Sequence, residues 1–341
     1  MGRRTSCAVV ILTLLTPLAG QAATHRASPG TINQVLARAT GGDVVVLGPG
    51  AYQGIRLSGR QFQPALVLDA RAASIEGFEI TKVHGLDIRG GAYRLPPPIT
   101  HPRTKRLVYG SGLRMDDVER VKINGITVQG PGATVGDDRA PFGDGYGVFV
   151  LRARDIEVSG SRFLGLKSGV VFGRVDGFRL TANSFVAMRS DGFQGAESRH
   201  GLIQDNECHG MRILPADHPD CIQLWSRPTS PPTADIVIRK NHAEGHTQGI
   251  GLFNHVRDGV DDGGFDRITI EDNDLAISFP HGIGVADARK SIVRNNSVRT
   301  LPDARWRASI NLTGDIVRCG NTVAAGAGKP AMKDEPCATA P

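Results

Sequence analysis

Aromatic side chains are scarce in this chain of 341 residues, where Phe, Trp and Tyr together make up 5%. A composition this poor in aromatics and holding 43 glycines suits thin stacked coils with tight turns. The sequence also lacks a basic run interleaved with aromatics, so nucleic acid is not an expected partner. Its five cysteines include no Cys-x-x-Cys spacing, which disfavours a metal site. The apolar stretch Cys7–Leu18 is too short to span a bilayer, so no membrane partner is expected.

The N-terminus has the three parts of a secretory signal peptide. Arg3 and Arg4 give the positive start, Cys7–Leu18 is the apolar stretch, and residues 20–23 offer small side chains for cleavage. We therefore assign residues 1–23 to a signal peptide and expect a soluble periplasmic or secreted protein. The formal net charge of +6 falls to +4 once these two arginines are removed, which suits an acidic partner or serves solubility alone.

Export also accounts for the remaining cysteines. Without the leader their number is even, which is typical of disulfides in an oxidising compartment. Proximity in the sequence predicts the pairs Cys208–Cys221 and Cys319–Cys337. In a chain-entropy picture each loop would contribute about 3 kcal/mol.

A repeated pattern fills the chain from about residue 85 to residue 323. A small residue followed by an apolar one recurs at Gly147, Gly169, Gly192, Cys221, Gly249, Gly282 and Ser309. Asparagines recur after short apolar strands at Asn183, Asn206, Asn241, Asn273, Asn296 and Asn321. A period of about 22 to 33 residues with two or three short, alternating β-runs per unit indicates a β-solenoid rather than helical repeats. The prediction is a single-domain, all-β, right-handed parallel β-helix of about eight to ten coils.

A short helix precedes the repeats. Ile32, Val35, Leu36 and Ala39 share one helical face, a glycine pair ends the helix, and a strand follows at residues 44–47. Such a helix would cover the open end of the solenoid. We place this cap at residues 24–52, the β-helix at 53–323 and a disulfide-pinned tail at 324–341. The stretch resembles the entry segment of exported β-helix polysaccharide enzymes such as alginate lyases, chondroitinase B and alginate epimerases, and the resemblance extends through the repeats.

Insertions interrupt the repeats at residues 94–110, 130–145, 211–219, 226–234 and 254–264. In a repeat protein, insertions tend to emerge on one face and wall a groove, so residues 186–285 are the expected working region. The recurrent asparagines are interpreted as structural, because asparagine tolerates the left-handed backbone of a tight corner.

Alignment of the coils on their small residues predicts adjacent polar ladders. The position just before each small residue holds Ser168, Asp191, Asp220, Gln248 and His281. Two places before this position stand Arg189, His218 and His246, and two places after the small residue stand Gln194 and Gln223. Coils lie about 4.8 Å apart, so these side chains would form ladders roughly 10–15 Å long. A stack of Arg, Asp, His and Gln on Val- and Ile-rich strands is hard to explain by packing and indicates a functional site.

The densest part of this pattern is residues 217–225. The proline between His218 and Asp220 favours an extended backbone that holds both side chains outward. Trp225 offers a surface on which a sugar could stack, or packs beneath a loop. The stretch resembles one in bacterial β-helix lyase-like proteins, and alginate epimerases carry Asp-Pro-His-Asp at a comparable place, in a different order from the one found here.

The resemblance implies cleavage of an acidic, uronate-containing polysaccharide by β-elimination. This reaction needs a neutral base and a partner for the enolate-like intermediate. His218 or His246 would be the base, Asp220 would orient a histidine, and Arg189 with Gln223 or Gln248 would neutralise the substrate carboxylate. The remaining substrate-binding candidates are Asp191, Gln194, Trp225, Asn254, His255 and His281.

Other functions stay open at this point. Asp191 and Asp220 could be the carboxylate pair of a glycoside hydrolase, although the Gly-His-Gly and Arg-Ile-Lys signatures of polygalacturonases are absent. Uronate epimerisation and non-catalytic carbohydrate binding are the further alternatives. No cofactor is required by the elimination mechanism, but calcium is possible at the Gly-rich loop that holds Asp258, Asp261, Asp262 and Asp266. A monomer is expected.

Overall fold

The computed structural model describes residues 22–103, 105, 107–130, 145–213, 217–226, 232–254, 263–324 and 331–338. The leader up to residue 21, His255, and three of the candidate calcium ligands lie outside the described residues. None of the helices in the described ranges has the length and apolarity needed to cross a membrane.

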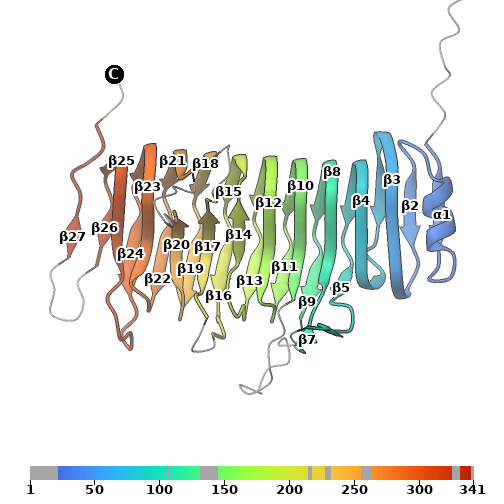
Figure 1. The fold of residues 1–341 in the computed structure, drawn as a ribbon, viewed down its shortest axis with the longest axis horizontal. Helices are drawn as coiled ribbons and strands as arrows, with labels where there is room; N and C mark the ends of the chain where they lie inside the picture. Colours follow the sequence, from blue (N-terminus) through green and yellow to red (C-terminus); the bar gives the residue numbers. More distant parts are fainter. Residues whose placement is uncertain are drawn as a thin grey trace, which may run out of the picture.

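The described chain is an all-β solenoid whose coils stack along one axis, as predicted (Figure 1). Strands of successive coils pair in parallel and in register. Ten buried apolar residues mark one such column: Ile55, Phe78, Leu113, Val148, Val170, Phe193, Ile222, Ile250, Ile283 and Ile310. Ten coils therefore contribute to this column, at the upper end of the expected range.

Each coil has three strand segments, which form a groove face, a second face and a third face in chain order. Long strands pass through the first two faces: β3 (Gly50–Asp69), β4 (Ala73–Arg89), β8 (Ser111–Asn124), β10 (Tyr146–Ser159), β12 (Ser168–Thr181), β23 (His281–Arg294) and β25 (Ser309–Cys319). Shorter strands on the groove face are β14 (Phe193–Ala196), β17 (Asp220–Trp225) and β20 (Gln248–Phe253). The second face adds β1 (Thr24–Ala27), β2 (Val44–Leu47), β15 (Arg199–Gln204), β18 (Thr233–Arg239) and β21 (Phe265–Glu271).

The third face is made of short strands. They are β5 (Ala92–Arg94), β9 (Thr127–Gln129), β11 (Arg162–Leu164), β13 (Ser184–Val186), β16 (Glu207–His209), β19 (His242–Gly245), β22 (Asp274–Ile277), β24 (Ser297–Thr300) and β26 (Thr322–Val323). Two antiparallel pairings complete the described strands: β6 (Ile99–Thr100) with β7 (Leu107–Val108), and β27 (Met332–Lys333) with β26.

The recurrent small residues stack in the interior, which explains the period of the sequence. A Cβ at Gly169 would lie 2.3 Å from the Phe185 ring, and a Cβ at Gly249 would lie 2.2 Å from the backbone oxygen of Gly282. Side chains from the third face fill this space, so most coils admit only glycine. In β17 the position holds Cys221, whose side chain is joined to Cys208 of β16 across the interior. Both predicted disulfides are confirmed, because Cys319 is also joined to Cys337.

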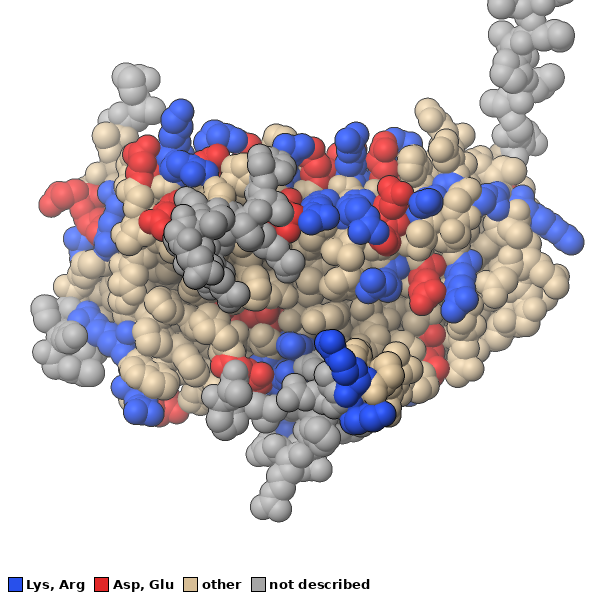
Figure 2. All heavy atoms as spheres, viewed as in Figure 1, with Lys and Arg blue, Asp and Glu red and all other residues tan. Residues whose placement is uncertain are grey.

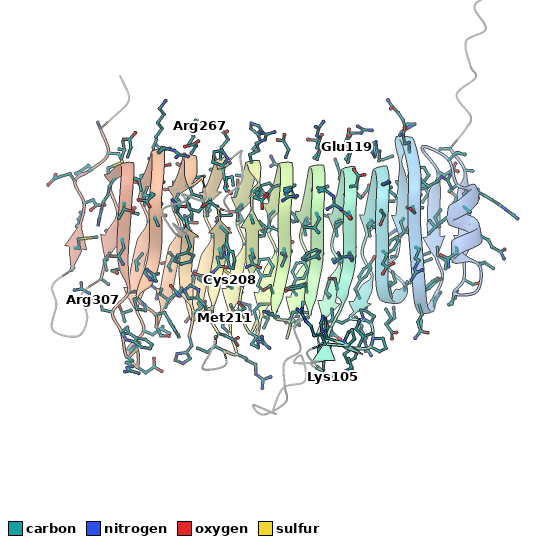
Figure 3. All side chains as sticks on the ribbon, viewed as in Figure 1. Lys105, Glu119, Cys208, Met211, Arg267 and Arg307 are labelled. Atoms are coloured by element: carbon teal, nitrogen blue, oxygen red, sulfur yellow. A yellow bond between two sulfur atoms is a disulfide. The ribbon has the colours of Figure 1, made fainter. Side chains whose placement is uncertain are left out.

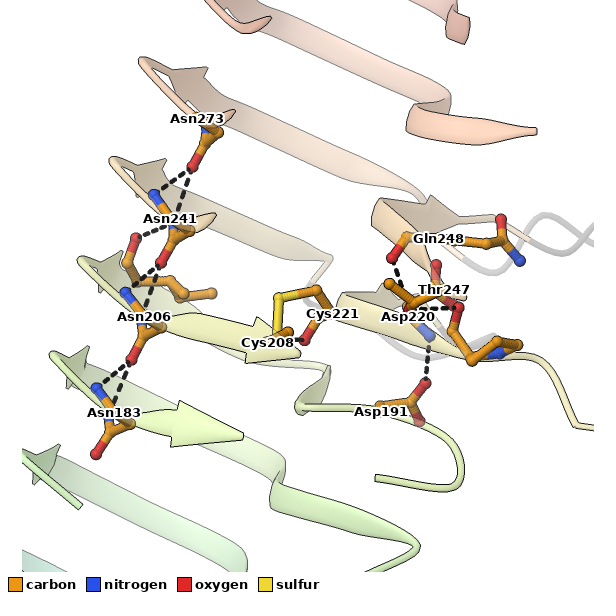
Figure 4. Close-up of a disulfide and its surroundings, with 12 residues drawn as sticks. Asn183, Asp191, Asn206, Cys208, Asp220, Cys221, Asn241, Thr247, Gln248 and Asn273 are labelled. Atoms are coloured by element: carbon orange, nitrogen blue, oxygen red, sulfur yellow. Dashed lines mark hydrogen bonds between the residues drawn. A yellow bond between two sulfur atoms is a disulfide. The ribbon is translucent and has the colours of Figure 1, made fainter. Parts of the chain in front are cut away.

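The asparagines form a buried ladder, but not for the predicted reason. Asn206 Nδ2 donates to Asn241 Oδ1 at 2.9 Å, and Asn241 Nδ2 donates to Asn273 Oδ1 at the same distance (Figure 4). The left-handed backbone falls one residue earlier, for example at Asp205 (φ 54°) and Lys240 (φ 54°). The asparagines are therefore selected for hydrogen bonds from coil to coil, and residues before them make the turn.

The ladder also measures the length of each coil. Asn183 and Asn206 are 23 residues apart, as are Asn273 and Asn296. Asn206 and Asn241 are 35 residues apart, because their coil carries two of the predicted insertions. A coil without insertions thus needs about 22 to 23 residues, and the excess leaves the coil at its corners.

The two ends of the solenoid are closed differently. Helix α1 (Ile32–Arg38) lies at the N-terminal end and buries Ile32 and Leu36, close to the predicted residues 32–39 (Figure 1). Strand β1, which was not predicted, pairs with β2 and adds a partial coil before the first full one. At the other end, β27 pairs with β26 and Asp334 binds Arg318 at 2.8 Å.

The predicted insertions interrupt the chain on both sides of the groove face. Residues 94–110, 130–145 and 211–219 precede groove-face strands, whereas residues 226–234 and 254–264 follow them. Figure 2 shows acidic and basic side chains gathered along the upper and lower edges of the view, with a mostly uncharged band between them. Glu119 and Arg267 lie at the upper edge in Figure 3.

Candidate functional site

A groove of about 790 Å³ crosses the outer side of β10, β12, β14, β17 and β20. Most of its lining comes from five consecutive groove-face strands and the corners just before them. Its polar and charged lining residues are Arg152, Lys167, Ser168, Arg174, Ser190, Asp191, Gln194, Glu197, His218 and Gln223. Its aromatic lining residues are Tyr146, Phe149, Phe172, Trp225 and Phe253.

The hollow follows from side-chain size along one outward column. Leu151 pairs with Gly173, which pairs with Ala196, which pairs with Trp225. The two small residues therefore lie between two large ones. Their short side chains leave the outer surface recessed over two coils. Trp225 then pairs with Phe253, which extends the high wall by one more coil.

His218 and Asp220 lie in contact beside the groove. The Nδ1 atom of His218 lies 3.0 Å from Oδ2 of Asp220. The His218 side chain is 55% exposed and lines the groove, whereas the Asp220 side chain is fully buried and does not line it. The hydrogen bond to Asp220 raises the pKa of His218 above its usual value, and partial burial opposes this shift. Asp220 therefore reaches a ligand only through the imidazole.

Asp191 lies one coil before Asp220. Its Oδ1 accepts a hydrogen bond from the backbone N–H of Asp220 at 3.2 Å, and its Oδ2 lies 3.1 Å from Ser190 Oγ. Burial and the neighbouring Asp220 charge raise the pKa of Asp191 well above its usual value. Burial also raises the pKa of Asp220, but the hydrogen bond to His218 opposes this. Burial and mutual repulsion thus favour the neutral form of the Asp191 carboxyl, while His218 favours the charged form of Asp220.

Three glutamine amides surround this pair. Gln248 Nε2 lies 2.9 Å from His218 Nε2, and Gln223 Nε2 donates to Asp220 Oδ2 at 2.8 Å. Gln194 Nε2 donates to Gln223 Oε1 at 3.1 Å, which extends the network into the groove. Asp191, Asp220 and the backbone of this region are shown in Figure 4.

The Gln248 amide suits a histidine that changes its protonation state. As placed, its N–H can donate to a neutral Nε2 while Nδ1–H of His218 donates to Asp220. Its Oε1 is buried and has no hydrogen-bond partner in the described part of the chain. A half-turn of the amide would present this oxygen to a protonated Nε2–H. Gln248 can therefore hold His218 in either state.

Other predicted residues lie elsewhere. Arg189 does not line the groove, and its Nε lies 3.1 Å from Asp217 Oδ2, so its charge is matched within the protein. His246 is also outside the lining, with Nδ1 at 3.2 Å from Ser278 Oγ and Nε2 at 3.7 Å from Asp303 Oδ2. The structure thus does not bring either side chain to the His218–Asp220 pair as the aligned sequence predicts, because both stand on corners whose direction strand spacing does not determine.

The remaining candidates are nearer to the site. Trp225 lines the groove and its indole N–H donates to Gln223 Oε1. His281 lies edge-on to the Phe253 ring at 6.0 Å, and Phe253 in turn contacts the His218 ring at 5.1 Å. Asn254 Oδ1 accepts a hydrogen bond from Ser226 Oγ at 3.0 Å and does not line the groove.

The candidate calcium loop lies mostly outside the described residues. Asp266 is described, and its carboxylate binds the Arg289 guanidinium. Across the described ranges, no three His, Cys, Asp or Glu side chains converge as metal ligands. Calcium therefore has no support from the described residues.

Apart from Trp225, sequence reasoning missed the aromatic and basic lining of the groove. Phe149 occupies the outward column that continues through Val171, Gln194 and Gln223, so extending the same alignment by two coils would have found it. Phe253 follows Trp225 in the neighbouring column. The basic residues carry no such signal, because Lys167 lies between two strands, and Arg152 (φ 49°) and Arg174 (φ 58°) lie at the left-handed bends inside β10 and β12.

Comparison with known proteins identifies the fold alone. No protein-family model matches this chain, and no curated protein sequence matches it. An alginate lyase from Paenibacillus sp. str. FPU-7 is similar, with a TM-score of 0.54 and 12% identity over 88% of this chain and 99% of that chain. PfbA, a surface adhesin of Streptococcus pneumoniae, has a TM-score of 0.51 and 12% identity over 89% of this chain and 94% of that chain.

A third similar structure is the tailspike protein of E. coli bacteriophage HK620 in complex with a pentasaccharide. It has a TM-score of 0.52 and 12% identity, and the match covers 86% of this chain and 57% of that chain. The chain thus shares the parallel β-helix of proteins that include a polysaccharide-cleaving enzyme, a glycan-bound phage protein and an adhesin.

Proposed function

We propose that this protein is an exported right-handed parallel β-helix enzyme that cleaves an acidic, uronate-containing polysaccharide by β-elimination. One observation carries the proposal: an exposed histidine in a groove, held at Nδ1 by a fully buried carboxylate. The groove also offers aromatic surfaces and the cation Lys167, which suit an acidic sugar chain, whereas Arg174 is paired with Glu197 at 2.7 Å. The similarity to an alginate lyase is consistent with this function, although at 12% identity it speaks to the fold.

The reaction begins with removal of the proton next to the uronate carboxylate. His218 would accept this proton at Nε2 once the Gln248 amide, whose nitrogen lies 2.9 Å from that atom, has moved aside, while Nδ1–H remains bound to Asp220. The resulting imidazolium is stabilised by the buried Asp220 charge and by rotation of the Gln248 amide, as its geometry allows. The electron pair left on carbon then forms the double bond as the bond to the glycosidic oxygen breaks, and that oxygen takes a proton from the His218 imidazolium or from water to become a hydroxyl group.

The substrate carboxylate needs a hydrogen-bonding or cationic partner. Arg189 is a poor candidate because it is paired with Asp217 outside the groove. Gln194 and Lys167 line the groove near His218 and are assigned this role instead. Trp225 and Phe253 would bind the apolar faces of sugar rings.

Hydrolysis by Asp191 and Asp220 fits the structure less well. A glycosidase places two carboxyl groups on either side of the scissile bond. Here Asp220 is fully buried, and Asp191 is 2% exposed and bound to the backbone of Asp220. Epimerisation would use the same base, and the similarity to an adhesin keeps non-catalytic binding as an alternative.

A panel of uronate polymers distinguishes these functions. Alginate, glucuronan, polygalacturonate and gellan-type polymers are incubated with the purified protein while ultraviolet absorbance is followed. Elimination gives an absorbing unsaturated end, and His218→Gln should abolish it. Reducing ends without absorbance would identify a hydrolase, and solvent deuterium in an intact polymer would identify an epimerase. Retention of the polymer without any chemical change would identify a binding protein.

A further inference from the structure

An exposed aromatic cluster lies outside the groove, near the C-terminal end of the solenoid. The Phe279 and Trp306 rings are 5.3 Å apart, and the Arg305 guanidinium lies 4.8 Å from the Trp306 ring centre. Trp306 is 43% exposed, and it is the only aromatic among the large apolar side chains that stand exposed in the described ranges. We call Phe279, Arg305 and Trp306 the distal platform.

The local structure holds the platform in place. Leu301 N–H donates to the backbone oxygen of Ile277 at 2.9 Å, which ties the Trp306 loop to the coil that carries Phe279. Within the loop, Ala304 N–H donates to the oxygen of Leu301 at 3.1 Å, and Ala308 N–H donates to Thr300 Oγ1 at 3.0 Å. The loop is therefore anchored at both ends while its tryptophan faces solvent.

The platform lies at the same corner of the coil as His218. His218 precedes the groove-face strand β17, His246 precedes β20, Phe279 precedes β23, and Trp306 precedes β25. These four strands are consecutive on the groove face, so about three strand spacings, or ~14 Å, separate the first coil from the last. Phe253 and His281 bridge the interval with edge-on ring contacts. These contacts extend the rings of the groove as far as β23, the strand that follows Phe279.

The chemistry of the platform matches that of an acidic sugar chain. An exposed indole offers a flat surface to the apolar face of a sugar ring. A guanidinium that lies on an aromatic face keeps its N–H donors in its own plane and directed away from the ring. There they can bind a carboxylate in bidentate fashion. Tryptophan and arginine are also the residues that contribute most to binding energy at protein surfaces.

We infer that the distal platform is a second binding site for the acidic polysaccharide, which extends from the groove along the corner toward the C-terminal coils. The inference rests on the proposed function for the identity of the polymer. It assigns to Trp306 and Arg305 the binding of sugar units that are remote from the bond being cleaved.

The test uses Trp306→Ala and Arg305→Ala in the full mature chain. Val317→Ala is the matched control, because Val317 is 59% exposed but lies on the second face. Affinity electrophoresis through gels that contain alginate or polygalacturonate measures binding without requiring turnover. Trp306→Ala should weaken retention by about tenfold, the loss expected for an exposed binding tryptophan, and Arg305→Ala by less. Trp306→Phe should keep part of the retention, and the control should keep all of it.

Kinetics give a second readout. On a long polymer, Trp306→Ala should raise KM by about tenfold and leave kcat unchanged, because the platform is remote from His218. On an oligosaccharide too short to reach the platform, neither constant should change.

The two proposals fail separately. If no polymer is cleaved but Trp306→Ala still loses retention, the proposed reaction is wrong and the platform stands. If cleavage occurs and Trp306→Ala binds like the control, the platform is wrong and the reaction stands. Failure of the wild-type protein to bind any polyuronate gel would overturn the platform as well.

Discussion

Two polar columns run along this solenoid, and they differ in how completely their hydrogen bonds are satisfied. In the asparagine ladder, Asn241 Nδ2 donates to two backbone oxygens and to Asn273 Oδ1, and its Oδ1 accepts from Asn206. The second column, here called the groove column, consists of the polar residues that precede the stacked small residues, namely Asp191, Asp220, Gln248 and His281. In this column, buried Asp220 Oδ1, Gln248 Oε1 and His281 Nδ1 have no hydrogen-bond partner among the described residues. The amide of Asn241 thus finds its hydrogen-bond partners within the protein, whereas the three buried atoms of the groove column do not find theirs among the described residues.

The difference separates structure from function. A buried polar atom without a partner costs about 1–3 kcal/mol, so a fold retains such atoms where another use favours them. The groove column also holds the buried Asp191 and Asp220, whose pKa values are raised by burial. Unsatisfied groups and perturbed carboxyls together indicate the site more specifically than polarity alone.

The largest expected effect concerns the groove column. His218→Gln keeps a side chain that can donate to Asp220 but removes the base, so turnover should fall by about 10² to 10⁴. The thermal midpoint should change little, because His218 is largely exposed. Activity assays and thermal denaturation of the same sample measure both quantities. A large fall in the thermal midpoint alongside the loss of turnover would show that His218 has a structural role instead.

Asn241→Ala tests the opposite column. It removes the contacts that the amide donates and the oxygen that accepts from the buried backbone N–H and Nδ2 of Asn206, so the unfolding free energy should fall by about 3 kcal/mol or more. The activity of the folded protein should remain. Urea denaturation followed by circular dichroism measures the change, with the exposed Asn124 as control: Asn124→Ala should shift the midpoint little. If Asn241→Ala were stable but inactive, the asparagine ladder would have a functional role and the comparison would be wrong.

The pH dependence of turnover sharpens the role of His218. Because Asp220 raises the pKa of His218, the imidazole stays protonated, and unable to act as a base, to a higher pH than an ordinary histidine. Activity should therefore rise with pH and reach its maximum above the usual histidine range. In Asp220→Asn the midpoint should move to lower pH, along with a loss of rate. A pH–rate profile of kcat/KM shows both; a rate that falls across this range would make His218 an acid.

The smallest effect concerns Asp191. Burial and Asp220 raise its pKa in the folded state, so between the ordinary value and the raised value the folded protein binds more protons than the unfolded chain. Its contribution to stability is therefore lost as pH rises through this window. Asp191→Asn removes the effect, so the variant should gain stability relative to the wild type as pH rises above the ordinary carboxyl range, about pH 4. Denaturant midpoints measured over a series of rising pH values follow the gain, and a constant difference would show that Asp191 stays ionised.

Much of the fold was predictable because its period is imposed by close packing. Gly169 and Gly249 recur since a Cβ at either would overlap its neighbours, and this constraint is visible in the sequence. The same strict register brought Asp220, Gln223 and Gln248 together as expected. The asparagines were correctly interpreted as structural, but their hydrogen bonds could not be read from residue type alone.

The failures have a common physical cause. Arg189 and His246 stand at corners, where a side chain's direction depends on the loop rather than on the alternation of a strand. The groove itself depends on a contrast in size between Gly173 or Ala196 and Trp225. A search for polar residues overlooks such a contrast, because small and aromatic side chains in sequence look like ordinary strand packing.

The coil without insertions gives this molecule a unit of length. About 22 to 23 residues advance the chain by one strand spacing, ~4.8 Å, and the coil that ends at Asn183 needs no more than this. That coil carries neither His218 nor Asp220. Duplicating it would lengthen one arm of the groove by a single step while the His218–Asp220 pair kept its neighbours. The length of the groove can therefore change in whole coils without altering that pair.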